Sequence, residues 1–272
     1  MPSPDNSFDS ARHLLRVWRA SARAATVREM EFRFNFFSGL IRQVLWLATF
    51  VLMIHVIYQH TDSLAGWSQL QVLTLLALSR IIEGLSDAFF HRNIAELPGV
   101  IQNGKFDFYL TKPVPAQFHT AFHRFRFLDL GNAAIGLVLL IYAVVRDPSM
   151  FTWTGWLLFA VLALLGMAVY YSILIIMVSV AFKFERFDGF FALDNLISEP
   201  LTAPFDIFPP GTKAVLTYLL PLAFIVFVPA EALTGRLEMS QLPIAFLITA
   251  VFLVLANLAW RAGLKRYSSA SS

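Results

Sequence analysis

Residues 151–182 read FTWTGWLLFAVLALLGMAVYYSILIIMVSVAF and contain no charged side chain. A helix needs about 20 predominantly apolar residues to cross the hydrocarbon core of a bilayer, so this stretch predicts a membrane-spanning helix. The composition agrees, because 57% of the 272 residues are hydrophobic and only 14% are charged, whereas a soluble domain carries about 25% charged residues. Since open sheet edges are not tolerated in lipid, we expect an all-α integral membrane protein.

Similar apolar runs on both sides of this stretch predict six transmembrane helices in all. Their approximate ranges are 36–58, 68–90, 127–145, 151–182, 187–205 and 242–260. The second run is less apolar than the others, and the fifth is interrupted by Asp188, Asp194 and Glu199. We assign residues 35–272 to one transmembrane domain. It shows no internal repeat, which argues against a secondary transporter built from inverted repeats.

Residues 10–34 predict an amphipathic helix before the first span. Four arginines recur at steps of four, three and four and share one stripe: Arg12, Arg16, Arg19 and Arg23. Apolar residues such as Trp18 fall on the opposite side. A basic stripe with an apolar back suits a helix at the cytoplasmic membrane surface. The alternative is a solvated helix packed on a soluble domain, but the chain offers little soluble domain. We therefore expect residues 1–34 to form a surface helix.

Residues 209–233 are apolar but broken by proline. Pro209, Pro221 and Pro229 fall within this segment, and proline removes a backbone donor and kinks helices. Broken helices are tolerated at membrane depth where they are buried in protein or line a cavity. The segment therefore predicts a re-entrant pair of short helices before the last span, and not a seventh crossing.

Basic residues set the expected orientation, because cytoplasmic loops of membrane proteins carry an excess of Lys and Arg. With a cytoplasmic N-terminus and six spans, the C-terminus is cytoplasmic as well. All Lys and Arg then lie inside or at inner span ends except Arg146, Lys213 and Arg236. A seven-span chain would instead export Arg261, Lys265 and Arg266.

The sequence lacks the common motifs for powering or catalysing a reaction. It has no Gly-x-x-x-x-Gly-Lys-Ser/Thr loop to cradle the phosphates of ATP and no Gly-x-Ser-x-Gly nucleophile elbow. It has no cysteine, which excludes disulfides and cysteine-based metal sites. The net charge of +3 is too small to indicate nucleic-acid binding. An energy-dependent function would therefore need a partner.

One histidine pair has metal-ligand spacing. His119 and His123 lie four residues apart, so on a helix they share a face and could bind zinc. A metal enzyme needs at least a third ligand, and no second histidine pair exists. We therefore expect no metal site and place the pair at the membrane surface beside Arg124 and Arg126.

The long polar stretch 91–126 contains a possible docking element. Residues 100–114 read VIQNGKFDFYLTKPV, with turn chemistry at Asn103 and Gly104 and a stop at Pro113. The short amphipathic piece between them, in which aromatic residues flank Asp107, could fit a groove of a soluble partner. The alternative is an ordinary loop lying on the membrane.

At this point the sequence resembles a known family. The pattern GKFDFYLTKPV at residues 104–114 is similar to the cytoplasmic signature of one branch of the ABC-2 type transporter permeases. Three later motifs, IFP at 207–209, LPLAF at 220–224 and VPA at 228–230, resemble the segment that precedes the last span in that branch. The basic N-terminal helix and the order of six spans agree as well, so the resemblance covers most of the chain.

The resemblance implies a membrane subunit of an ABC exporter in a bacterial inner membrane, not an enzyme. Two permeases, identical or related, would form the pathway and bind two ATPase subunits. ATP and Mg²⁺ would be bound by those partners, and no cofactor by this chain. The contact with the ATPases would use the N-terminal helix and the loop after the second span: Arg16, Arg19, Gly104, Lys105, Asp107, Leu110 and Pro113.

The same resemblance places the second and fifth spans beside the pathway, which gives a role to the charges within them. Arg80, Glu83 and Asp87 share one helix face, and Asp194 and Glu199 lie in the fifth span. Ionisable groups inside membranes are costly and usually face protein or water. We expect the acidic residues to line a polar pathway that favours a cationic or amphipathic substrate. The alternative is that Arg80 simply pairs with Glu83 while the others lie at the interface with water.

Two other functions remain compatible with these features. One is an intramembrane enzyme that modifies lipid with a metal held by His119, His123 and acidic residues. The other is a membrane scaffold with no role in transport.

Overall fold

The computed structural model describes residues 33–183 and 189–267, and these residues fold into helices without a β-strand. Within these ranges, four helices are long and apolar enough to cross a membrane: Phe37–Tyr58, Phe127–Arg146, Trp153–Phe182 and Gln241–Leu264. They confirm the all-α class, and they coincide with four of the expected spans. The predicted surface helix, with Arg16 and Arg19, falls almost wholly outside the described residues.

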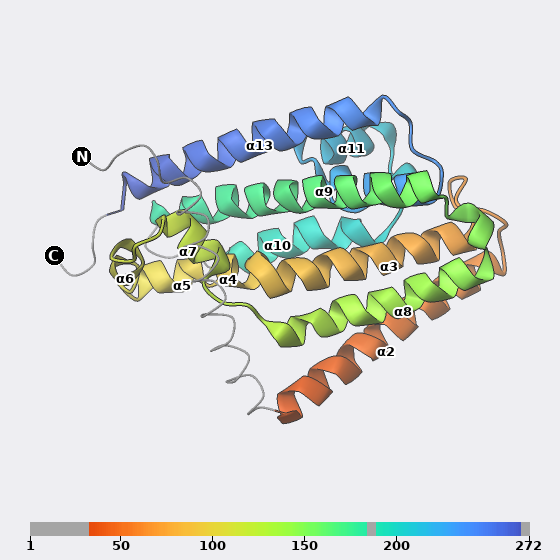
Figure 1. Cartoon of the computed structure of the whole chain (residues 1–272), viewed down its shortest axis with the longest axis horizontal. Coiled ribbons are helices and arrows are strands. Elements are labelled where there is room, and N and C mark those ends of the chain that lie inside the picture. The colour runs from red at the N-terminus through yellow and green to blue at the C-terminus, as the bar shows by residue number, and fades with distance from the viewer. Residues whose placement is uncertain (1–32, 184–188, 268–272) are drawn as a thin grey trace.

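The main helices lie along one axis, and each runs in the direction opposite to the one before it (Figure 1). In chain order they are α2 (Arg33–Tyr58), α3 (Gln69–Ser86), α8 (Leu130–Arg146), α9 (Trp153–Ser179), α10 (Phe190–Ser198) and α13 (Gln241–Leu264). Helix α2 diverges from the others in Figure 1, and few of its side chains are buried. The other helices form the packed body of the molecule.

Helix α3 lies at the centre of the bundle. Its residues 72–79 are all buried, and it packs mainly against α8. Close approach depends on Gly136 of α8, where an added Cβ would lie 2.6 Å from the carbonyl oxygen of Ala77. Small residues at such contacts let helix backbones meet, which is how helices pack in membranes. The helix starts at a capping box in which Ser68 and Gln71 satisfy each other's backbone N–H groups.

Helix α9 forms a second pair with α13. Thr152 caps its first turn by accepting a hydrogen bond from the Gly155 N–H, and the 3₁₀ turn Val180–Phe182 extends it. The observed helices differ from the predicted ranges 127–145, 151–182 and 242–260 by only a few residues. The agreement is close because a continuous apolar run stays helical along its whole length.

The second and fifth predicted spans differ from the four apolar helices. Helix α3 carries Arg80 and Glu83, and α10 has nine residues followed by the 3₁₀ turn Glu199–Thr202. Neither meets the length and hydropathy that mark the four apolar helices. A helix surrounded by protein does not need a continuous apolar surface, and the buried position of α3 explains its lower hydropathy.

The proline-rich segment after α10 breaks into short pieces. They are the 3₁₀ turn Phe205–Ile207, α11 (Pro210–Ala214), the π-helical turn Val215–Leu219, the 3₁₀ turn Leu222–Phe224 and α12 (Phe227–Leu233). Pro209 precedes α11 and Pro221 separates two turns, while Pro229 lies in the first turn of α12, where backbone N–H groups have no intrahelical acceptor. Every residue of α12 is buried, and it packs against α9 and α3.

Short helices gather at the opposite end of the bundle, where α13 also ends (Figure 1). A π-helical turn, Asp87–His91, continues α3 and leads to α4 (Arg92–Ala95), α5 (Leu97–Gln102), α6 (Asp107–Leu110) and α7 (Ala116–Phe122). The 3₁₀ turn Phe127–Asp129 then starts α8. We call this the α6 end of the bundle, and we call the opposite end, where α11 lies, the α11 end.

Candidate functional site

The GKFDFYLTKPV motif forms a tight helical hairpin between α5 and α6. Gly104 has a φ of 65°, a left-handed conformation that glycine adopts without steric cost. The turn is closed by the Lys105 N–H, which donates to the Val100 carbonyl oxygen at 2.9 Å. The predicted turn at Asn103 and Gly104 is therefore confirmed, and it reverses the chain directly before α6.

The hairpin is held to the bundle by Phe106. This side chain is fully buried, and its ring lies 5.1 Å from Phe182, 6.3 Å from Trp260 and 5.1 Å from Tyr267, measured between ring centroids. The Tyr267 hydroxyl donates to Asp107 Oδ1 at 3.0 Å. The hairpin therefore contacts the ends of both α9 and α13.

The other face of α6 is exposed and apolar. Phe108 is 68% exposed and Leu110 is 45% exposed, and Lys105 and Pro113 are exposed as well. One short element thus combines a buried anchor on one side with an apolar surface on the other. The hairpin is therefore fixed to the bundle on one side and presents apolar side chains to its surroundings on the other.

The histidine pair lies directly behind this hairpin. His119 and His123 are on α7 and at its end, with ring centroids 4.8 Å and 5.7 Å from the Tyr109 ring. Burial, together with His123 and Lys112 nearby, lowers the pKa of His119 to about 4. Within the described ranges, no group of three or more His, Cys, Asp or Glu side chains is placed to hold a metal ion. The two rings pack beside each other, 5.4 Å apart between their centroids.

The predicted pathway residues fall into separate groups. Asp87 and Asp194 come together through a residue that sequence reasoning left in the loop, His91. Its Nδ1 lies 2.5 Å from Asp87 Oδ1 and its Nε2 lies 2.9 Å from Asp194 Oδ1. Its ring stacks on Tyr170 of α9, and Arg92 lies 3.4 Å from Asp87. The only local signal for this bridge was the i, i+4 spacing of Asp87 and His91.

The other charges in these helices lie apart from that bridge. Arg80 pairs with Glu83 at 2.5 Å and lies 4.2 Å above the Trp46 ring. This pair agrees with the first part of the alternative interpretation, but Asp87 and Asp194 are buried and not at an interface with water. Arg80 and Glu83 border a small cavity next to Ser198. Glu199 is exposed. The structure thus joins α3 to α10 at the α6 end, but it does not gather all five predicted residues at one surface.

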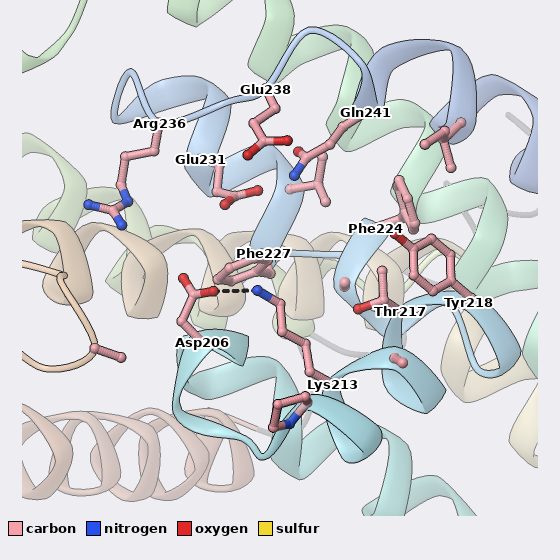
Figure 2. Close-up of a pocket in the computed structure, with 16 residues that line it drawn as sticks. Asp206, Lys213, Thr217, Tyr218, Phe224, Phe227, Glu231, Arg236, Glu238 and Gln241 are labelled. Atoms are coloured by element: carbon pink, nitrogen blue, oxygen red, sulfur yellow. Dashed lines mark hydrogen bonds and ion pairs between the residues drawn. The ribbon is translucent and has the colours of Figure 1, made fainter.

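A larger cavity opens at the α11 end, and none of the predicted pathway residues lines it. Its volume is about 770 Å³, and Figure 2 shows acidic, basic and aromatic side chains around it. Lys213 lies 2.5 Å from Asp206, which also accepts a hydrogen bond from Trp67 Nε1 at 2.7 Å. Burial works against the charged form of Asp206, but these donors outweigh it and lower the pKa of its carboxyl group.

A family of known proteins matches most of the chain. The model of the ABC-2 family transporter proteins matches residues 44–271, which include the hairpin, the α3–α10 bridge and the whole proline-rich segment. A search of curated proteins found no match. The family match agrees with the helical membrane fold and with the resemblance of the GKFDFYLTKPV motif, and it extends over far more than half of the chain. The chain therefore belongs to the ABC-2 transporter family.

Proposed function

We propose that this chain is the membrane-spanning permease subunit of an ATP-driven ABC-2 type exporter. Two permeases would form the translocation pathway, and separate ATPase subunits would bind at the α6 end. One observation carries this proposal: α6 exposes Phe108 and Leu110 while its neighbour Phe106 is buried among the ends of α9 and α13. Exposed apolar patches mark sites of contact with another protein or with a membrane.

The membrane topology follows from the same proposal. Helices α3 and α10 with the turn after it would join the four apolar helices as spans two and five, giving six crossings. Residues 209–233 would enter from the outer side as a re-entrant segment, because their short helices are packed inside the bundle. Both termini would then lie in the cytoplasm of a bacterial cell, on the side of the ATPases.

Transport would require that a movement of the ATPases is transmitted to the pathway. A shift of α6 acts on Phe182 and Trp260 through Phe106, and on the residues after α13 through the Asp107–Tyr267 hydrogen bond. In the same proposal, Glu83, Asp87, Asp194 and Glu199 line the pathway, together with Arg80. The His91 bridge between Asp87 and Asp194 would then hold α3 and α10 together in the closed state.

The proposal is tested by purifying the tagged chain in mild detergent from its native host. Co-purifying proteins are identified by mass spectrometry, and ATP hydrolysis is measured. We expect an ATP-binding subunit in stoichiometric amount with the wild-type chain and its loss with Phe108→Ser, Leu110→Ser. A second variant, Asp107→Lys, Pro113→Ala, tests the same element.

The matched control is Met239→Ser. Met239 is 66% exposed, close to the 68% of Phe108, but it lies in the loop before α13 at the α11 end. This variant should keep the ATPase. An ATPase retained by every variant would contradict the proposed contact, and its absence from the wild-type preparation would favour a scaffold.

A further inference from the structure

The cavity at the α11 end is lined almost entirely by the proline-rich segment and the residues that follow it, with Ala65 as the one lining residue from elsewhere in the described chain. Its walls come from α11 and the π-helical turn after it, from α12, from the loop before α13 and from the start of α13. Its volume of about 770 Å³ lies within the range of small-molecule sites. In Figure 2, Glu231 and Gln241 lie on one wall, and Lys213 and Thr217 extend from the segments opposite.

Both cationic side chains around the cavity contact other groups, although Arg236 Nε has no hydrogen-bond partner among the described residues. Lys213 is paired with Asp206. Arg236 donates from Nη1 to the Gly66 carbonyl oxygen at 2.8 Å, and its guanidinium group lies 4.8 Å from the centroid of the Trp67 ring. Glu231 forms no ion pair within the described parts of the chain. Three acidic side chains line the cavity against these two basic ones, so the acidic groups are in excess by one: Asp206, Glu231 and Glu238.

Unpartnered acceptor atoms gather at the same place. Glu231 is only 8% exposed. It lies on the same side of the cavity as Gln241 (Figure 2), and its Oε2 has no hydrogen-bond partner. Gln241 Oε1 and Thr217 Oγ1 are also buried without a partner, and all three residues line the cavity. Buried polar atoms are normally satisfied, and leaving them unpaired is costly. A ligand with several hydrogen-bond donors would remove this cost.

The rest of the wall suits an apolar group. Phe224, Phe227 and Ile244 line the cavity beside these acceptors. Phe227 is itself held in place by stacking on Phe205, at 5.4 Å between ring centroids. A ligand that fits both parts needs an ammonium group with three N–H donors and an apolar or aromatic body attached to it.

From this geometry we propose that the cavity is a binding site for amphipathic primary amines, with Glu231, Gln241 and Thr217 accepting hydrogen bonds from the ammonium group. The site is separate from the α3–α10 bridge, and it rests on the cavity alone, whether or not the chain pairs with an ATPase. A free amine and an amine-bearing lipid headgroup share this chemistry.

The test measures binding of a fluorescent probe to the full chain in nanodiscs made of choline lipids only. The probe is dansyl-pentylamine, and its acetylated form serves as the uncharged control. We expect saturable binding of the amine, seen as a rise in fluorescence anisotropy, and none of the acetylated form. Glu231→Gln should weaken binding by about tenfold or more, because hydrogen bonds to charged groups contribute about 1.5–3 kcal/mol.

Asp62→Asn is the matched control, since it removes one acidic charge from an exposed side chain in the loop between α2 and α3, and Asp62 does not line the cavity. It should bind the amine like the wild type. Thermal unfolding is measured for each variant, and Gln241→Leu and Thr217→Val replace Glu231→Gln if that variant does not fold. Equal binding of the acetylated probe, or unchanged binding in the cavity variants, would overturn the proposal.

A last measurement separates the two sources of the amine. Ethanolamine lipid is added to the nanodiscs at constant total lipid. Displacement of the probe assigns the cavity to a lipid headgroup, and unchanged probe binding assigns it to a soluble amine. Both outcomes keep the amine site.

Discussion

The two ends of the bundle differ in what surrounds their polar groups. Within the described parts of the chain, buried side-chain atoms without a partner occur at both ends, for example on Asn93 and Thr120 at the α6 end, but those at the α11 end gather around the large cavity. At the α6 end, His91 bridges Asp87 and Asp194, and Arg126 and Arg124 both reach Glu96. At the α11 end, four of the ten buried side-chain atoms that lack partners within the described residues border a single cavity. They belong to Thr217, Glu231, Arg236 and Gln241.

This difference separates two kinds of function. Paired charges and a buried aromatic anchor make a rigid connection, which suits the passing of movement between subunits. Unpaired polar atoms around a cavity, most of them acceptors, favour the binding of a ligand. Substitutions at the α6 end should therefore change stability and assembly, whereas substitutions around the cavity should mainly change binding. The predictions below follow the expected size of their effects.

The largest effect is expected at His91. Replacement by Leu leaves Asp87 and Asp194 buried without their shared partner, and breaking a buried ion pair in this way costs about 3–5 kcal/mol. Thermal unfolding in nanodiscs would show the loss. The triple variant His91→Leu, Asp87→Asn, Asp194→Asn should recover much of it, because no uncompensated charge remains. Equal loss in the single and triple variants would contradict the bridge.

A slightly smaller effect is expected at Phe106. Truncation to Ala empties a fully buried site, and such changes cost about 3 kcal/mol or more. Phe108→Ala, two residues away and 68% exposed, should leave the unfolding temperature unchanged while weakening the ATPase contact. This pair of variants separates the anchor of the hairpin from its docking face. Similar unfolding temperatures for both would mean that Phe106 does not hold the hairpin.

Packing of the proline-rich segment against α9 should depend on Gly166. An added Cβ there would collide with the backbone of Phe224 and Ile225, and overpacking of this kind costs about 1–3 kcal/mol. Gly166→Ala should lower the unfolding temperature and alter the cavity enough to weaken amine binding. Gly211→Ala is the control, because no atom lies within 4 Å of its added Cβ.

The smallest effect is a pH dependence at the α6 end. The pKa of His119 is lowered to about 4 in the folded chain, below the value of about 6.5 in unfolded chains. The folded state thus binds fewer protons, so stability is full above pH 6.5 and falls as the pH drops towards 4. Unfolding temperatures measured between pH 7 and pH 4.5 should decline less for His119→Gln. His123, whose pKa is also lowered, should retain its own share of the decline.

Several features of the molecule could be predicted from the sequence because their causes are local. The run 151–182 specifies α9, since hydropathy acts residue by residue. Gly104 marks its turn because only glycine adopts that φ without cost. Pro221 breaks the helix where it stands, because proline lacks the N–H that a helix interior requires. The family motif could be recognised for the same reason, as it lies in one continuous stretch.

Contacts between segments that are distant in the sequence could be identified only from the folded structure. His91 and Asp194 are 103 residues apart, and no pattern in either segment indicates that they meet. Glu231 lies inside an apolar run, and its position beside a cavity depends on how α12 packs against α9. Because a bilayer favours any apolar helix equally on all its faces, hydropathy places the helices in the membrane, and only the packing of small and polar side chains decides which of them touch.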